Sequence, residues 1–481
     1  MKLSAAPGVF DIVPIETKEQ WRCSHLWNYV ENMIRQTVTA YGFQEIRTPI
    51  FERTELFHRG VGETSDIVSK EMYTFLDKGE RLMSLRPEGT APAMRAFIEH
   101  QLHNLAPVHK LFYIGPMFRY ERAQAGRYRQ HHQFGAEAIG NAAPEQDVEL
   151  IDMLFTLYQR LGLQKLQVSI NTIGDIDCRL NFRKALQDYL RSYYDSLSPD
   201  SQARFETNPL RILDSKDTKD REIIANAPSI LNFLNEECLD HFNDVKKLLG
   251  NLKIPFEVNP KLVRGLDYYN KTVFEITSGE LGAQNSVAGG GRYDGLLKTL
   301  GGPDLPAIGF GTGLERVIQT MLKQEVSLPK PFAPTLFIIA MGQKAKEASF
   351  SLLHDLRLHG ISAEMDFSNK KVNKLMQYAN QIEASNVAVI GDNELQKGEI
   401  EIKDMLSGTK RTLPLMHAAK ILYYEKQNGI FMKNLEELSK PFSQPSEADF
   451  FINRLNETIN LTTQAVNNLQ SALQKMQDIL E

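Results

Sequence analysis

A charged pattern in residues 109–140 has the residue types and the spacing to bind a substrate that is both anionic and polar. Arg119 and Glu121 are two residues apart in one run, and Gln133 and Glu137 are four apart in the run that returns. Side chains two or four positions apart on a strand share one face. The planar fork of arginine can bind phosphate oxygens bidentately. The pattern predicts a β-hairpin with a binding face, although a solvated charged hairpin tip explains the arginines alone equally well.

Two further segments carry polar side chains with a choice of roles. The carboxylate of Glu88 lies just before a predicted helix, so it either stabilises the helix start or receives a substrate ammonium group, and the segment alone favours the helix start. In residues 264–275, Arg264 suits a phosphate or carboxylate, and a hydroxyl of Tyr268 or Tyr269 suits an imidazole nitrogen. Adjacent strand residues face opposite ways, which predicts that the two tyrosines are not partners of each other in a core. A tyrosine-rich strand is the equally supported alternative.

Two glycine-rich runs indicate a close approach of the backbone to another group. GGGRYDG (289–295) has three glycines without side chains to pack, so it is predicted to form a tight turn or a close contact and not a core element. The chain has neither GxGxxG in a strand–helix–strand unit nor GxxxxGKS/T, so a dinucleotide site and a P-loop are unsupported. GFGTGLERVI places Glu315 and Arg316 in the first turn of a predicted helix, where the arginine can reach back to a nucleotide phosphate.

The elements that must position these residues form two kinds of domain. Residues 1–325 mix predicted strands, among them the hairpin, with helices, and a polar helical stretch at about 175–253 is interpreted as an insertion in this part of the chain. SLPKPFAPT is a proline-rich junction. Strands and helices then alternate over 333–425, which predicts a separate α/β domain with a mostly parallel sheet. Residues 430–481 are predicted to be a C-terminal helical extension.

The composition fits a globular protein of several domains. The 481 residues are 42% hydrophobic and 24% charged, and the net charge of −5 excludes a uniformly basic nucleic-acid coat but not a local basic surface. Cys23, Cys178 and Cys238 are scattered, with no paired metal spacing and no disulfide framework, which favours a reducing cytoplasm. No apolar stretch reaches the ~20 residues of a membrane span. Residues 1–20 do not have the pattern of a signal peptide.

Five segments, in order, resemble those of the histidyl-tRNA synthetases, a family of class II aminoacyl-tRNA synthetases. GFQEIRTPIFERTELFHRGVGETSDIVSKEMYTF resembles the interface motif of the class, MFRYERAQAGRYRQHHQFGAEAIG its hairpin motif, and AIGFGTGLERVI its last motif. LVRGLDYYNKTVFE and VAGGGRYDGL resemble signatures of the histidine subgroup. The resemblance covers roughly residues 7–425. Each motif alone is moderate evidence, whereas five in the right order are strong evidence.

The resemblance implies an ATP-dependent ligase that joins L-histidine to tRNA(His) through a histidyl-adenylate and releases AMP and pyrophosphate. It implies a homodimer in the cytoplasm. It implies that Mg²⁺ is bound mainly through the phosphates of ATP, with no metal held by a dedicated protein site. Residues 1–325 are then expected to be an α+β catalytic domain built on an antiparallel sheet with helices, and the α/β domain is expected to bind the anticodon.

The resemblance also implies roles for individual residues. The expected catalytic residues are Arg264 and Arg119. The expected histidine-binding residues are Glu88, Gly89, Thr90, Arg119, Gln133, Glu137, Arg264, Tyr268 and Tyr269. The expected ATP-binding residues are Arg119, Glu121, Arg127 and Arg316. Glu88 and Thr90 are expected to hold the substrate amino group, and Glu137 and one tyrosine to read the imidazole. Gln133 is expected to lie near the substrate carboxylate, and Glu121 to bind the adenine amino group.

This chain departs from the family pattern in one loop, and two rival interpretations remain open. Tyr120, Ala123 and Ala125 stand where the family often has histidine, proline and lysine, which weakens the expected loop contact with the tRNA acceptor end but leaves the chemistry intact. One rival is a catalytically silent paralogue that regulates histidine biosynthesis. Such proteins lack the anticodon domain and parts of the histidine signature, both of which this chain has.

The other rival is a synthetase for proline, threonine or glycine, against which Glu137 and the Tyr268–Tyr269 pair argue. The tail at 430–481 matches nothing expected of the bacterial enzymes. A helix packed on its own domain is the favoured interpretation, with dimer support and a tRNA clamp as alternatives.

Overall fold

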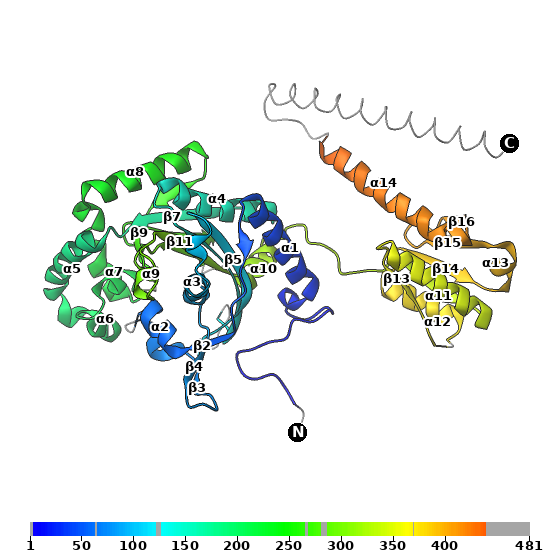
Figure 1. The fold of residues 1–481 in the computed structure, drawn as a ribbon, viewed down its shortest axis with the longest axis horizontal. Helices are drawn as coiled ribbons and strands as arrows, with labels where there is room; N and C mark the ends of the chain where they lie inside the picture. Colours follow the sequence, from blue (N-terminus) through cyan, green and yellow to red (C-terminus); the bar gives the residue numbers. More distant parts are fainter. Residues whose placement is uncertain are drawn as a thin grey trace. The chain divides into compact units, whose positions relative to one another are not determined.

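The computed structural model describes residues 3–62, 65–121, 127–264, 268–279, 286–368 and 370–438, with side chains up to residue 429. The chain divides into two units, residues 1–331 and 332–481, and each unit has its own hydrophobic core (Figure 1). The predicted helical extension lies outside the described residues from position 439 onward, as do Ala123 and Ala125 of the hairpin loop.

Unit 1 is built on an eight-stranded sheet with the order β1-β5-β6-β11-β10-β9-β7-β8. Neighbouring strands from β5 to β7 are antiparallel, whereas β1 and β8 are parallel to β5 and β7 at the two edges. The strands are β1 (Gln44–Glu45), β5 (His109–Phe118), β6 (Gln130–Ile139), β7 (Leu166–Thr172), β8 (Phe256–Val258), β9 (Asn270–Ser278), β10 (Ser286–Arg292) and β11 (Ala307–Gly313). The predictions of an antiparallel catalytic sheet and of a hairpin within residues 109–140 are confirmed.

Alternate side chains of this sheet enter two separate cores, as the period of a strand requires. Phe112 and Phe134 belong to the larger core, whereas Leu111 and Tyr113 belong to the smaller one. The helices of the larger core are η1 (Gln20–Arg22), α1 (Ser24–Ala40), α4 (Pro144–Arg160), α8 (Glu236–Asn251) and α10 (Leu314–Lys323). Those of the smaller core are α3 (Thr90–Glu99), η3 (Leu102–Asn104) and α9 (Leu296–Thr299).

A helical insertion connects β7 to β8 (Figure 1). Its elements are α5 (Ile176–Arg191), η4 (Tyr194–Ser196), α6 (Pro199–Arg204), η5 (Pro209–Asp214), α7 (Thr218–Ala225), η6 (Ile230–Phe233) and α8. Buried residues such as Phe182, Leu186 and Ile212 give it a small core of its own. Helix α8 leads the chain back to the sheet, because Phe242 and Val245 join the larger core.

A small antiparallel sheet of unit 1 has the strand order β2-β4-β3. Its strands are β2 (Phe51–Arg53), β3 (Thr74–Leu76) and β4 (Leu82–Leu85), and α2 (Thr54–Val61) and η2 (Ile67–Glu71) belong to the same region. Pro49 precedes β2, which is an edge strand as the proline predicted. Phe51, Phe75 and Leu76 are exposed on this sheet.

Unit 2 is a five-stranded sheet in the order β13-β12-β14-β15-β16 with helices. Its elements are β12 (Leu336–Ala340), α11 (Gln343–Leu358), β13 (Ala363–Met365), α12 (Val372–Gln381), β14 (Asn386–Ile390), α13 (Asp392–Lys397), β15 (Glu399–Asp404), β16 (Lys410–Pro414), η8 (Leu415–His417) and α14 (Ala418–Leu438). The first three strands in the sheet order are parallel and the last two form a hairpin, so the α/β prediction is confirmed. In the described parts of both units, no helix is long and apolar enough to cross a membrane.

Candidate active site

A pocket of about 310 Å³ opens over the centre of the large sheet, where β6, β10 and β11 lie side by side. Ten of the predicted site residues line it: Glu88, Thr90, Arg119, Glu121, Arg127, Gln133, Arg264, Tyr268, Tyr269 and Arg316. They come from segments far apart in the sequence, and the sheet register is what unites them. Two predicted residues are not in its lining: Gly89 lies against Tyr113, and Glu137 is fully buried in β6.

Glu88 has the helix-start role considered from the sequence, and it also lines the pocket. Its carboxylate accepts hydrogen bonds from the backbone N–H of Thr90 (2.7 Å) and of Ala91 (2.8 Å), at the start of α3. The same side chain lines the pocket. Burial raises the pKa of Glu88 above its ordinary value, although these hydrogen bonds oppose the rise. The helix start therefore orients a carboxylate towards the pocket.

Glu137 is the centre of a buried hydrogen-bond network. Thr90 Oγ1 donates to Glu137 Oε1 at 2.8 Å, and the Tyr113 hydroxyl donates to the same oxygen at 3.1 Å. The Tyr293 hydroxyl donates to Glu137 Oε2. Burial raises the pKa of Glu137 to about 8, although the three donors act in the opposite direction. The group therefore titrates near neutral pH, where small changes in its surroundings alter its charge.

Glycines of β11 make room for the polar side chains of β6. Gly309 lies opposite Glu137 in the register, and a Cβ atom there would lie 1.7 Å from Glu137 Oε2. A Cβ atom at Gly311 would lie 1.8 Å from Gln133 Nε2. The run GFGTG therefore lets neighbouring side chains lie close to its backbone, and part of it also lines the pocket.

The prediction that GGGRYDG is not a core element is wrong. Gly289, Gly290 and Gly291 are buried in β10, a central strand between β9 and β11. Their neighbours pack over them: a Cβ atom at Gly289 would lie 2.2 Å from Arg264 Nη2. The predicted close approach of other groups to this backbone is correct, but the run forms a strand and not a tight turn. The strand is stable because it pairs with strands on both sides, so it does not depend on side chains of its own.

One end of the pocket is strongly cationic. Arg119 Nε donates to Pro87 O at 2.9 Å, and Arg316 Nη1 donates to Ser286 O at 2.7 Å. Arg127 Nε lies 3.3 Å from Glu121 Oε2. Burial, and then the nearby charge of Arg127, lower the pKa of Arg316. Three guanidinium groups with one paired carboxylate make this end suited to an anion with several charges.

The tyrosine pair is arranged differently from the strand prediction. Tyr268 and Tyr269 precede β9, and their ring centroids lie 4.6 Å apart, so the expectation that they do not pack on each other is wrong. Both line the pocket. Arg264 also lines it, and its Nη1 lies 3.3 Å from Glu275 Oε1. The residues between Arg264 and Tyr268 lie outside the described part of the chain.

Sequence reasoning missed several residues of this site. Tyr113 and Tyr293 bind Glu137, and Glu275 pairs with Arg264. His131 lines the pocket, and burial, followed by the charge of Arg119, lowers its pKa to about 3, so it is neutral. Their roles depend on which strands are neighbours, and no spacing within a single segment carries that information.

Comparison with known proteins agrees with the geometry. A family profile described as histidyl-tRNA synthetase matches residues 22–317, and one described as an anticodon-binding domain matches residues 335–423. A protein of Protochlamydia amoebophila named histidine–tRNA ligase is 67% identical over 422 residues, which cover 88% of this chain and 100% of that protein. One of Caldanaerobacter subterraneus with the same name is 46% identical, covering 84% and 96%.

Solved structures lead to the same family. The crystal structure of apo Staphylococcus aureus histidyl-tRNA synthetase superposes with a TM-score of 0.74 at 37% identity, and covers 88% of this chain and 100% of that chain. A structure from Nostoc at 20% identity, with a TM-score of 0.64 and coverage of 88% and 100%, shares the fold. The pocket, the two domain matches and these relatives together show that the chain belongs to the histidyl-tRNA synthetase family of class II aminoacyl-tRNA synthetases.

Proposed function

We propose that the pocket over β6, β10 and β11 is where this histidine–tRNA ligase forms histidyl-adenylate from histidine and ATP. A carboxylate oxygen of histidine attacks the α-phosphorus of ATP, and the bond from that phosphorus to the pyrophosphate oxygen breaks. In the second step a hydroxyl of the terminal ribose of tRNA(His) attacks the acyl carbon, and AMP leaves with the electron pair of the bond that breaks. The regulatory-paralogue and other-synthetase alternatives are set aside, because both domain profiles and a 67% identical histidine–tRNA ligase match the chain.

The observation that carries this assignment is the convergence of cations and carboxylates in one pocket. We assign Arg119 and Arg264 to the α-phosphate, where negative charge develops during the attack. Arg127 and Arg316 are assigned to the outer phosphates, and Glu121 to the adenine amino group. These groups supply placed charge and orientation, and no covalent step passes through the protein.

Histidine is assigned to the opposite side of the pocket. Its amino group meets the carboxylate of Glu88 and the hydroxyl of Thr90, and Gln133 lies by its carboxylate. A carboxylate has about four acceptor positions, and Thr90, Tyr113 and Tyr293 use three of those of Glu137. The remaining position is assigned to an imidazole nitrogen, and a hydroxyl of Tyr268 or Tyr269 to the other nitrogen. An apolar amino acid would leave these buried groups unpaired, which rejects it by factors on the order of 10⁴.

Gly89 is the one histidine-site residue whose role comes from lacking a side chain. A Cβ atom there would lie 2.1 Å from Tyr113 Cε2, so a larger residue would displace Tyr113 and with it a donor to Glu137. We therefore assign Gly89 to the histidine site as a space for that tyrosine.

ATP–pyrophosphate exchange tests the assignment, with each amino acid supplied in turn to the purified protein. We expect exchange with histidine alone. Replacing Arg264 by alanine is expected to lower kcat by about 10²–10³, the loss found when one group that stabilises the transition-state charge is removed. Arg221→Ala, on the exposed surface of α7, is the matched control and should exchange as the wild type does. Folded protein that exchanges with no amino acid would overturn the proposal.

Mg²⁺ is proposed to enter with the nucleotide. Three site carboxylates already have partners: Glu88 caps α3, Glu121 pairs with Arg127, and Glu275 pairs with Arg264. The ATP phosphates are then the main ligands, and the ion would neutralise the pyrophosphate leaving group. Exchange that persists in full after chelation of divalent cations would contradict this.

A homodimer is proposed through the small sheet β2-β4-β3. Phe51 is 52% exposed and Phe75 43%, and their ring centroids lie 6.4 Å apart, so the two rings form an apolar surface on one face of this sheet. We expect twice the chain mass of 54.6 kDa by light scattering, and a shift towards monomer in Phe51→Glu. A wild-type monomer at micromolar concentration would contradict the proposal.

The division of labour between domains is also proposed. Residues 1–325, with the insertion at about 175–253, carry the chemistry, and residues 333–425 bind the anticodon of tRNA(His). The role of the extension at 430–481 is left open. We place the protein in the cytoplasm, where ATP and tRNA are available. Removing residues 333–481 should abolish tRNA charging but retain histidine-dependent exchange, and equal loss of both activities would contradict this division.

A further inference from the structure

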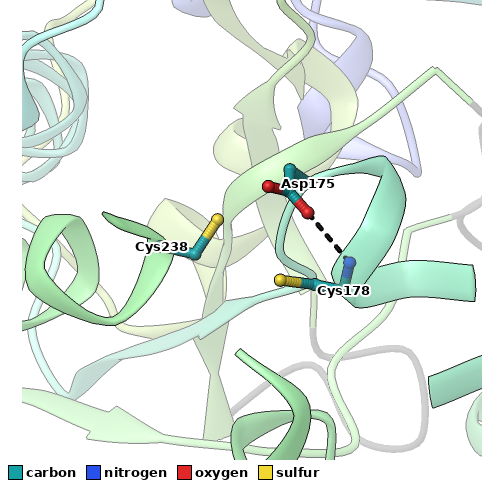
Figure 2. A group of neighbouring side chains, drawn as sticks. All are labelled: Asp175, Cys178 and Cys238. Carbon is teal, nitrogen blue, oxygen red and sulfur yellow. Dashed lines mark hydrogen bonds between the residues drawn. The ribbon is translucent and has the colours of Figure 1, made fainter. Parts of the chain in front are cut away.

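Two of the three cysteines, far apart in the sequence, lie together at the base of the helical insertion. Cys178 is in the first turn of α5 and Cys238 in the first turn of α8. Figure 2 shows their sulfur atoms and the carboxylate of Asp175 around one shared space. One ligand atom from each of the three residues lies within 4.8 Å of the other two. Their scattered sequence positions gave no indication of this cluster.

Helix capping explains part of the cluster but not the thiols. Asp175 Oδ1 accepts from the Cys178 N–H at 2.9 Å, and Asn235 Oδ1 accepts from the Cys238 N–H at 2.9 Å. Asn235 Nδ2 also donates to Asp175 Oδ2 at 2.7 Å. These bonds use the backbone of the two cysteines, so any residue at either position would serve the caps. The two sulfur atoms beside a carboxylate therefore need a separate explanation.

We propose that Cys178, Cys238 and Asp175 bind one Zn²⁺ ion. Zinc prefers thiolate, imidazole and carboxylate ligands, with Zn–S near about 2.3 Å and Zn–O near about 2.0–2.2 Å, so ligand atoms in a tetrahedral site lie roughly 3.5–3.8 Å apart. The ligand atoms of the observed cluster need to approach one another by no more than about 1.3 Å to reach this geometry. The Asp175 carboxylate accepts from the backbone N–H of Asp177 and Cys178, from Asn235 Nδ2 and from the Cys178 thiol, and the position used by the thiol becomes free for a metal when that thiol loses its proton.

The surroundings fit the charge of such a site. Two thiolates, one carboxylate and Zn²⁺ sum to one negative charge, and the positive ends of α5 and α8 both meet here. The Asn235 N–H donates to Cys178 Sγ at 3.2 Å, which stabilises a thiolate further. The described residues supply three ligands, and water is assigned the fourth place on the side of Asp175, which is only half-buried. The thiols themselves are 2% and 1% exposed.

The site would join the first and last helices of the insertion, α5 and α8, next to the histidine pocket. Lys271 N–H donates to Gly174 O at 2.8 Å, directly before Asp175. Arg179 Nη1, one residue after Cys178, donates to Tyr269 O at 2.7 Å. The metal would therefore position the tyrosine segment through α5, with a larger effect on the KM for histidine than on kcat.

Cobalt binding tests the proposal independently of catalysis. Full-length protein is stripped with chelator under reducing conditions and titrated with Co²⁺ alone, without ATP or histidine. We expect one Co²⁺ per chain, a near-ultraviolet thiolate-to-cobalt charge-transfer band, and displacement by Zn²⁺. Cys178→Ser and Cys238→Ser should lose the band. Cys23→Ser, a buried free cysteine in the region of α1 whose Sγ donates to Ile15 O, should keep it.

Asp175→Asn keeps the proposal testable if a serine variant does not fold. The amide oxygen still caps α5, but the anionic ligand is gone, so we expect at least tenfold weaker Co²⁺ binding by a protein of wild-type circular dichroism. Three outcomes would overturn the proposal: no thiolate band from folded wild-type protein, a band that survives both serine substitutions, or a Cys178–Cys238 disulfide without bound metal under these conditions.

Discussion

Gly309→Ala is the most direct test of how Glu137 is held. The new Cβ atom would lie 1.7 Å from Glu137 Oε2 and 2.8 Å from Ala136 O, so the carboxylate has to move. A non-bonded contact between carbon and oxygen needs at least roughly 3.2 Å, which requires a displacement of about 1.5 Å or more. That movement breaks the bond from Tyr293, which donates to the same oxygen.

The expected effect follows from the bonds that are lost. A hydrogen bond to a charged group contributes about 1.5–3 kcal/mol. If the displaced Glu137 loses one such bond to the imidazole of histidine, kcat/KM for histidine falls by a factor of about 10–150, since each 1.36 kcal/mol corresponds to tenfold. The KM for ATP should change little, because the atoms nearest to the new Cβ belong to Glu137 and Ala136 and not to the residues assigned to ATP.

ATP–pyrophosphate exchange over a range of histidine concentrations measures this effect, and thermal unfolding shows whether the variant is folded. The matched control is Gly295→Ala, because its φ is −92° and a Cβ atom there meets nothing within 4 Å. A Gly309→Ala protein with wild-type kcat/KM for histidine would refute the assignment of Glu137 to the imidazole.

Three further predictions concern charge. The pKa of Glu137 is about 8 and that of free imidazole about 6.5, so if the pair shares one proton, histidine affinity should be highest between these values. Below about pH 6.5 both free groups are protonated, so binding requires the loss of one proton. Above about pH 8 neither is protonated, so binding requires the gain of one. Glu137→Gln should remove the decline of histidine affinity at alkaline pH, as measured by calorimetry between pH 6 and 9. A decline that persists in this variant would contradict the shared proton. Arg316→Ala should raise the KM for ATP at least tenfold, whereas the control Arg221→Ala should keep the wild-type KM. The same KM for ATP in both variants would contradict the assignment of Arg316 to a phosphate. Arg292→Met leaves the buried Asp147 carboxylate without its main cation and should lower the unfolding free energy by about 3–5 kcal/mol. Lys298→Met removes an exposed ion pair that contributes about 0–1 kcal/mol. Similar losses of unfolding free energy in denaturant titrations of the two variants would contradict this distinction.

Local patterns predicted those parts of the fold that depend on local chemistry. A polar helical stretch predicted the insertion, and two strand-like runs with a short link predicted the β5–β6 hairpin. The alternation of strands with helices predicted the α/β unit. The same reasoning failed where one segment takes its environment from another. The glycines at 289–291 looked unfit for a core, yet they form a central strand because Arg264 and Phe310 pack against them. Tyr268 and Tyr269 were treated as strand residues, but they precede β9 and their rings pack against each other at an angle of 49°.

The sequence by itself determined which chemical groups this protein has, and their order along five motifs was enough to predict the family. It could not determine which groups meet. Tyr113 and Tyr293 reach Glu137, and Gly309 makes room for it, only because β5, β6, β11 and β10 are neighbours in one register. Cys178 and Cys238 likewise come together through the packing at the base of the insertion. Periodicity reports on one element at a time, whereas contacts between elements are set by strand pairing and helix packing over the whole chain.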